Sequence, residues 1–332
     1  MTRSRLFGVL ALAALALAAC GKGPQEEAEP GVIRFSVLSV DPATSLDKAW
    51  SPIVVAMEAS TGLAVKPSYV SDEHALIDAL RRRTTDFGWL SDQAGLEAVR
   101  KAGSEVFARA APMQGSDGDH AVLMVNAKSK VTLERALKCD RTLTLGLGDA
   151  HSTAGSLAPE TYLFAPRGLW AAKCFRQVRR ASPEANLAAV ASGALDIAAT
   201  STTWLSRARQ DGRVVGGVRE IWRSPPLPEK PLIWRKDLDP AIKEKLRQFF
   251  LTYGQGDAAQ RAKLAAVGVS GFLPADNTHL LPMREMEATH VWLEAEASGD
   301  KTRIGDARRA LDAVTAERLD LEARTRAPAA AQ

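Results

Sequence analysis

The long alternation of strand-like and helix-like segments constrains this chain more than any other feature. Short apolar runs rich in β-branched residues alternate with segments whose apolar residues recur at helical spacing. The predicted strands are 32–40, 63–69, 86–90, 105–112, 121–126, 142–147, 175–181, 221–224 and 232–235. Predicted helices cover 48–60, 72–83 and 152–163, and only helices are expected after residue 235, at 240–253, 257–267 and 282–326. Strands separated by helices predict open α/β sheets. With 332 residues, the chain is long enough for two domains.

The N-terminus has the pattern of an exported lipoprotein. Arg3 and Arg5 precede an apolar run from residue 6 to 19, which is too short to span a bilayer but suits a signal peptide at 1–19. The sequence Leu-Ala-Ala-Cys ending at Cys20 resembles a bacterial lipobox, so we expect lipid on Cys20 to anchor the protein on the periplasmic side of a bacterial membrane. An ordinary secretory signal with a chance cysteine is the alternative. Residues 20–30 then form a polar tether.

Composition and charge exclude several classes of protein. Apolar residues make up 46% and charged residues 25% of the chain, which excludes a disordered or collagenous chain. The net charge is +4, and removal of a signal peptide with two arginines leaves about +2. That charge is not concentrated on any segment, so we expect no nucleic-acid partner.

Two cysteines remain after the lipobox, in an oxidising compartment. Cys139 precedes the strand 142–147, and Cys174 opens the strand 175–181, with a helix between them. In such a βαβ unit both strands begin on the same side, so the two sulfurs could form a disulfide. Two free buried thiols are the alternative.

Motifs for catalysis or metal binding are absent from the sequence. The histidines at 74, 120, 151, 279 and 290 lack the spacing of zinc ligands. There is no nucleophile elbow, phosphate-binding Walker loop or dinucleotide fingerprint. We therefore expect neither an enzyme nor a bound cofactor or metal.

One turn has the composition of an anion site. Residues 148–155, Gly-Asp-Ala-His-Ser-Thr-Ala-Gly, link the strand 142–147 to the following helix. The first N–H groups of a helix lack partners within it, and with the helix dipole they favour an anion. Ser152 and Thr153 would add hydroxyl donors. The alternative is that Ser152 or Thr153 is an ordinary helix cap.

From residue 31 to about 285 the chain resembles the phosphonate-binding periplasmic proteins that supply ABC importers. The similar segments are Trp50–Pro52, Asp86–Trp89, 115–118, 148–155, 191–200, 221–225 and 234–238. The resemblance implies a type II periplasmic-binding-protein fold with two lobes, each an open α/β sheet, and a ligand cleft between them. Lobe 1 would comprise 31–121 and 226–281 and lobe 2 would comprise 122–225, followed by a C-terminal helical segment at 282–332.

The resemblance also implies a ligand site. The family's phosphonate contacts correspond to Ser152, Thr153, Ala154 and Gly155, with alanine at 154 where serine is usual. At positions where the family has two tyrosines, this chain has Glu73 and Asp119. Two acidic residues that receive an ammonium group in the family correspond to Thr203 and Lys230. His151 and His120 are expected near the same cleft and could donate to an oxyanion.

These observations predict a solute-binding protein. It would capture a phosphonate or a related phosphorus oxyanion and deliver it to the permease and ATPase of an ABC importer. Two alternatives use the same fold: binding of a lipid or another apolar ligand outside ABC import, or a sensor domain.

Overall fold

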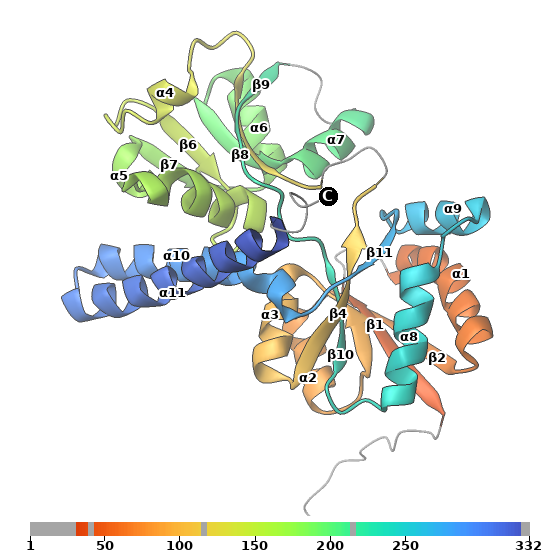
Figure 1. Cartoon of the computed structure of the whole chain (residues 1–332). Helices are drawn as coiled ribbons and strands as arrows, with labels where there is room; N and C mark the ends of the chain where they lie inside the picture. The colour runs from red at the N-terminus through yellow and green to blue at the C-terminus, as the bar shows by residue number, and fades with distance from the viewer. Residues whose placement is uncertain (1–30, 39–42, 114–117, 213–216, 327–332) are drawn as a thin grey trace, which may run out of the picture.

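The computed structural model describes residues 31–38, 43–113, 118–212 and 217–326 (Figure 1). The predicted signal peptide, the predicted lipidation site Cys20 and the tether lie outside these residues, as do 115–117 of the family-like segment 115–118. None of the helices in the described ranges combines the length and the apolar character needed to cross a bilayer.

The first of two sheets has six strands in the order β11-β4-β10-β3-β1-β2. Its members are β1 (Val32–Leu38), β2 (Ala64–Val70), β3 (Phe87–Trp89), β4 (Ser104–Ala111), β10 (Pro231–Arg235) and β11 (Gly271–Pro274). Strand β1 is parallel to β2 and β3, whereas β10 and β11 pair antiparallel with their neighbours. The sheet thus combines the start of the chain with a later segment.

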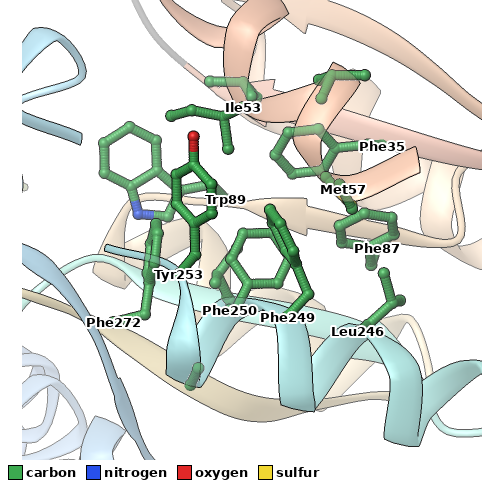
Figure 2. Close-up of a cluster of buried hydrophobic side chains, with 14 of the residues drawn as sticks. Phe35, Ile53, Met57, Phe87, Trp89, Leu246, Phe249, Phe250, Tyr253 and Phe272 are labelled. Atoms are coloured by element: carbon green, nitrogen blue, oxygen red, sulfur yellow. The ribbon is translucent and has the colours of Figure 1, made fainter. Parts of the chain in front are cut away.

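Helices pack on the first sheet over a core rich in aromatic side chains. The helices are α1 (Ala43–Thr61), α2 (Glu73–Arg81), α3 (Asp92–Lys101), α8 (Pro240–Thr252) and α9 (Ala258–Ala266). Figure 2 shows Phe249 and Phe250 of α8 pointing toward Phe35 and Phe87 of the sheet. Phe35 stacks on Phe87 with ring centroids 4.6 Å apart. This packing fixes the end of β3, where Trp89 contacts the same core.

The second sheet has five strands in the order β7-β6-β8-β5-β9. Its strands are β5 (Ala121–Asn126), β6 (Thr144–Leu147), β7 (Gln177–Arg180), β8 (Ile197–Ser201) and β9 (Val218–Arg223). The associated helices are α4 (Leu133–Ala136), α5 (Ala171–Cys174), α6 (Pro183–Ser192) and α7 (Thr202–Gln210). Strand β6 is parallel to β7 and β8, so its carboxyl end lies beside theirs.

Two chain crossings between the sheets are bonded to each other. The N–H of Ala121 donates to Ser224 Oγ at 2.9 Å, and the N–H of Ser224 donates to the Ala121 carbonyl at 2.9 Å. The N–H of Leu227 donates to the Asp119 carbonyl at 2.8 Å. The crossings therefore run side by side between the two sheets.

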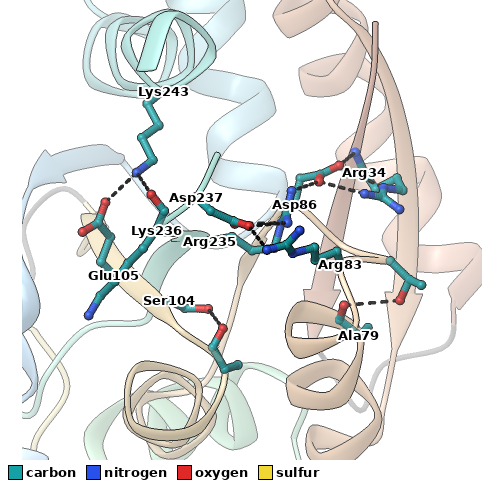
Figure 3. A network of polar contacts seen from close by, with 12 residues as sticks. Arg34, Ala79, Arg83, Asp86, Ser104, Glu105, Arg235, Lys236, Asp237 and Lys243 are labelled. Atoms are coloured by element: carbon teal, nitrogen blue, oxygen red, sulfur yellow. Dashed lines mark hydrogen bonds and ion pairs between the residues drawn. The ribbon is translucent and has the colours of Figure 1, made fainter. Parts of the chain in front are cut away.

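A buried ion-pair network joins the interior strands of the first sheet at the end that lies away from these crossings (Figure 3). Asp86 accepts from the guanidinium of Arg34 on β1 and from that of Arg235 on β10, each at 2.9 Å. Burial by itself would raise the pKa of Asp86, but the hydrogen bonds and positive charge of Arg34, with the charge of Arg235, lower it.

Asp86 begins the Asp-Phe-Gly-Trp segment. A Cβ on Gly88 in that segment would lie 2.8 Å from the Ser36 carbonyl oxygen, so only glycine fits.

The C-terminal helices α10 (Leu281–Ser298) and α11 (Lys301–Arg326) lie side by side as a hairpin (Figure 1). Gly299, at a φ of 71°, ends α10 in the left-handed conformation. Helix α10 packs against α3 of the first sheet and also against the helical segment that follows β6. The hairpin thus contacts the secondary structure of both sheets.

Several predicted elements differ from the structure. The prediction of helices alone after residue 235 is wrong, because Gly271–Pro274 forms β11 on the edge of β4. Only Phe272 of this strand is buried, so the strand lacks the alternation of buried and exposed residues by which a strand is predicted. Helix α1 begins at Ala43 instead of residue 48, and α3 was not predicted. Cys174 does not open a strand; it ends α5, and β7 begins at Gln177.

The predicted helix 152–163 is present but is wider than an α-helix. Two π-helical segments cover Thr153–Leu157 (η1) and Pro159–Phe164 (η2). The N–H of Leu157 accordingly donates to the carbonyl five residues earlier, that of Ser152, at 3.0 Å. Such wide turns occur frequently at functional sites.

Cys139 and Cys174 are joined by a disulfide, with their Cα atoms 4.0 Å apart. The bond connects the loop before β6 with the end of α5, at the amino end of these strands. It therefore lies at the opposite end of β6 from the 148–155 turn.

Candidate functional site

A cavity of about 450 Å³ lies between the two sheets, where three strand-to-helix turns converge. The turn after β3 contributes Trp89 and Asp92, and the turn after β6 contributes residues 152–154. The turn after β8 contributes Ser201 and Thr203. Ligands of open α/β sheets bind at the carboxyl ends of strands, which is where all three turns lie.

The 148–155 turn is compact because two glycines face each other in it. The N–H of Gly148 donates to the Gly155 carbonyl at 2.9 Å. A Cβ on Gly155 would lie 2.8 Å from Ser152 Oγ, and one on Gly148 would lie 3.1 Å from the same atom. A side chain at either glycine would displace Ser152, so both glycines set the shape of this turn.

Ser152 is a helix cap and also lines the cavity. Its Oγ accepts from the N–H of Gly155 at 3.2 Å, which is the capping geometry that the sequence allowed. A hydroxyl that accepts in this way keeps its own hydrogen for a second partner. The first N–H groups of η1, those of Thr153 and Ala154, lie at the start of the helix, where no intrahelical acceptor precedes them. The turn therefore presents hydroxyl and amide donors at the cavity wall.

Asp119 lines the cavity but is engaged in the crossing between the sheets. Its Oδ1 accepts from the N–H of His120 at 3.0 Å, from Thr202 Oγ1 at 2.9 Å and from the N–H of Thr203 at 2.9 Å. These bonds attach the crossing to the start of α7. Of the two predicted ligand contacts in this region, Thr203 is the more exposed.

Among the acidic groups that line the cavity, Asp92 has the pKa that is raised furthest above its ordinary value. It lies in the first turn of α3, and its Oδ1 is buried without a hydrogen-bond partner among the described residues. Burial raises the pKa of Asp92 to about 7, and the nearby carboxylates of Glu229 and Asp119 add to the rise. Burial and the Asp119 carboxylate also raise the pKa of Glu229. The first-sheet side of the cavity therefore holds closely spaced acidic groups.

Titration of Asp92 should make anion binding depend on pH. Above pH 7 the ionised Asp92 repels an anionic ligand, so Asp92→Asn should bind the predicted phosphorus oxyanion, with inorganic phosphate as the probe, about 3- to 10-fold more tightly than the parent protein at pH 8.5. At pH 6, where Asp92 is protonated, the two affinities should be equal. Because both proteins meet the same ligand, its own ionisation cancels in the ratio, which calorimetry measures.

Asp78→Asn is the matched control, because Asp78 is an exposed carboxylate on α2 that pairs with Arg81 and Arg82 outside the cavity. An affinity ratio that stays constant from pH 6 to 8.5 for Asp92→Asn would contradict the role of Asp92.

Lys230 lies among these acidic groups and over an aromatic ring. Its Nζ is 4.8 Å from the ring centroid of Trp89, which is a cation–π distance. Trp89 is 7% exposed and packs on Trp50, so it forms a rigid cavity wall backed by the aromatic core. Arg207 adds a second cation to the lining.

Four of the predicted ligand contacts lie outside the cavity lining. Gly155 is buried behind Ser152. His120 is buried and its Nδ1 pairs with the Ser224 carbonyl at 2.8 Å, while His151 is exposed with its ring 5.7 Å from that of His290. Glu73 accepts from Ser91 Oγ at 2.7 Å. By contrast, six predicted residues line the cavity: Asp119, Ser152, Thr153, Ala154, Thr203 and Lys230.

Sequence reasoning missed Asp92, Ser201, Arg207 and Glu229, which also line the cavity. Asp92 and Ser201 lie at the carboxyl ends of β3 and β8, so the rule for ligand sites in open sheets could have found them. Arg207 and Glu229 had no such signal. Within the described ranges, no group of three or more histidine, cysteine or acidic side chains has the arrangement of a metal site.

Comparison with protein families gives one match over most of the chain. Residues 35–280 match the family described as "ABC transporter, phosphonate, periplasmic substrate-binding protein". The phosphonates-binding periplasmic protein of Escherichia coli (strain K12) is 30% identical over 262 residues, which are 78% of this chain and 77% of the relative.

Solved structures with the same fold include two phosphonate-related proteins. A binding protein component of an ABC phosphonate transporter from Pseudomonas aeruginosa is 32% identical, with a TM-score of 0.66 over 90% of this chain and 99% of the other. PhnD1 from Prochlorococcus marinus (MIT 9301), solved in complex with methylphosphonate, has a TM-score of 0.60 at 19% identity, over 78% of this chain and 97% of the other. The fold is therefore that of type II periplasmic binding proteins.

Proposed function

The chain belongs to the periplasmic substrate-binding proteins of phosphonate ABC transporters, and from that premise we propose that the 148–155 turn is its phosphonate-binding element. In this proposal the hydroxyls of Ser152 and Thr153 and the N–H groups of Thr153 and Ala154 donate to the phosphonate oxygens. No bond is made or broken in the ligand, so the hydroxyls act as donors and not as nucleophiles.

The observation that carries this proposal is the position of the turn. Residues 152–154 line the cavity between the sheets at the carboxyl end of β6. Hydroxyl and amide donors fixed at a helix start match the oxygens of a phosphorus oxyanion. In this proposal four of the predicted contacts do not touch the ligand, because they lie outside the cavity lining: Glu73, His120, His151 and Gly155.

The charges of the cavity favour a polar ligand. Five charged side chains line it: Asp92, Asp119, Arg207, Glu229 and Lys230. An apolar ligand would remove them from water without supplying hydrogen bonds, which is costly. We therefore favour a phosphorus oxyanion over the alternatives of a lipid or another apolar ligand.

Two further parts of the proposal concern organisation and location. We assign the first sheet to lobe 1 (31–121 and 226–281) and the second to lobe 2 (122–225), with β5 moving the first boundary to just before Ala121. Closure of the lobes on the ligand would present it to the permease and ATPase. The lipobox-like sequence supports a lipid anchor on Cys20 at the periplasmic face of the membrane.

Calorimetry on the mature protein tests the ligand class. Methylphosphonate should bind with a stoichiometry of about one, as expected for a single inter-lobe site, and phosphite and phosphate rank the selectivity among phosphorus oxyanions. If none of the three binds, while the protein is folded and monodisperse, the proposal is wrong.

A further inference from the structure

Arg180 lies directly behind the 148–155 turn. It is the last residue of β7, and in the parallel pairing of β6 with β7 it lies opposite Leu147, the residue before Gly148. Its side chain is half-exposed and is not part of the cavity lining. Arg180 therefore approaches the turn from the side away from the proposed ligand.

One nitrogen of the Arg180 guanidinium binds the two ends of the turn together. Its Nη1 donates to the Gly148 carbonyl at 3.1 Å and to Ser156 Oγ at 2.8 Å. Ser156 is fully buried, and its Oγ also donates to the Gly148 carbonyl at 3.1 Å. A closed set of three hydrogen bonds thus connects the last strand residue, the start of the turn and the first helical turn.

The second nitrogen of the guanidinium fixes its orientation. Arg180 Nη2 is 3.6 Å from Glu160 Oε1, and Glu160 is 8% exposed. The other oxygen of Glu160 is 3.8 Å from Nδ1 of His290, which lies on α10. Because the fork of arginine is planar, the contact with Glu160 also orients the nitrogen that bonds Gly148.

These contacts bear on the geometry of the donors. The Gly148 carbonyl accepts hydrogen bonds from Arg180 and Ser156 behind the turn. Gly148 and Gly155 approach each other so closely that the backbone of the turn has no space to rearrange. Donors aimed at an anion must be held within about 0.5 Å of their positions to act together. Loss of the hydrogen bonds behind the turn would let the N–H groups of residues 153–154 move.

We propose that Arg180 is the positioning residue of the anion site, which it serves by holding Gly148 and Ser156 from behind without contacting the ligand. The inference rests on the proposed function, since it assigns to that site a residue outside its lining. Arg180 positions the turn through the planar hydrogen bonds of its guanidinium group and not through its positive charge.

The test compares Arg180→Gln with Arg179→Gln. Arg179 is the neighbouring exposed residue of β7, so both variants remove one positive charge within one residue of each other. Arg180→Gln should bind methylphosphonate about 10-fold more weakly than the parent protein, whereas Arg179→Gln should stay within about 2-fold of it. Equal losses in the two variants, or no loss in Arg180→Gln, would overturn the inference.

Arg180→Lys separates the fork from the charge. An ammonium group keeps the charge but cannot bond Gly148, Ser156 and Glu160 in the planar arrangement, so its affinity should stay closer to that of Arg180→Gln than to the parent. Full recovery of affinity in Arg180→Lys would assign the effect to charge and overturn the inference. This variant also serves if Arg180→Gln does not fold.

A spectroscopic readout distinguishes positioning from general destabilisation. In the ligand-free protein, the amide resonances of Thr153 and Ala154 should shift in Arg180→Gln while those of β5 keep their positions. Unchanged turn resonances would contradict the inference. If the parent protein binds no phosphorus oxyanion, the proposed function fails, but these resonances still test whether Arg180 holds the turn.

Discussion

Replacing both Ser152 and Thr153 with alanine should weaken methylphosphonate binding by at least about 100-fold, because hydrogen bonds to a charged group contribute about 1.5–3 kcal/mol each. Both residues line the cavity at the start of η1. The backbone N–H groups remain in the variant, so residual binding of the anion is expected. Calorimetry at a fixed pH and salt concentration measures the loss.

The control for this experiment separates binding from helix capping. Ser152 Oγ caps the N–H of Gly155 at 3.2 Å, and Ser182 Oγ caps the N–H of Ala185 in α6 at the same distance. Ser182→Ala should therefore lower the free energy of unfolding by about 0.5–2 kcal/mol, which is similar to the cost of losing the Ser152 cap. The affinity of Ser182→Ala for methylphosphonate should not change. Undiminished affinity in the Ser152→Ala/Thr153→Ala protein would remove the 148–155 turn from the ligand site.

Removing the disulfide should give the largest change in stability. Replacing Cys139 and Cys174 with serine opens a loop of 35 residues, and in the chain-entropy model this lowers the free energy of unfolding by about 3–4 kcal/mol. Urea unfolding of the variant, and of the parent protein with and without reductant, measures the loss.

The same variant should bind methylphosphonate normally under conditions where it is folded. The disulfide lies at the amino end of β6, and the 148–155 turn follows its carboxyl end. Coincident urea transitions for the variant and the parent would contradict the expected stabilisation. A loss of affinity without a loss of stability would instead indicate that the disulfide shapes the turn.

The alternation of strands and helices predicted open α/β sheets because apolar periodicity reflects burial within each segment, and the family resemblance implied that there are two of them. Elements stabilised by tertiary contacts escaped prediction. Strand β11 buries only Phe272 and exists because the edge of β4 is available to it. The π-helical segments η1 and η2 after Ser152 pack against α10, and no local sequence pattern reports such contacts.

The ligand site was predictable where it follows from a local pattern and not where it follows from packing. The composition of the 148–155 turn predicted its place at a helix start. Asp119 was expected to contact the ligand, and it lines the cavity. The sequence did not predict that its Oδ1 is bonded to the start of α7, a segment more than 80 residues away in the sequence. The raised pKa of Asp92 depends on Glu229 and Asp119, which only the folded chain brings near it.

The position of α10 has a consequence for opening. This helix contacts α3 of the first sheet and η1 and η2 beside the second, so it bridges the two halves of the molecule. If one half of the molecule rotates away from the other, α10 must move relative to α3 or relative to η1 and η2. The energy of the α10 contacts, together with the two crossings, then sets how far apart the halves lie before a solute binds.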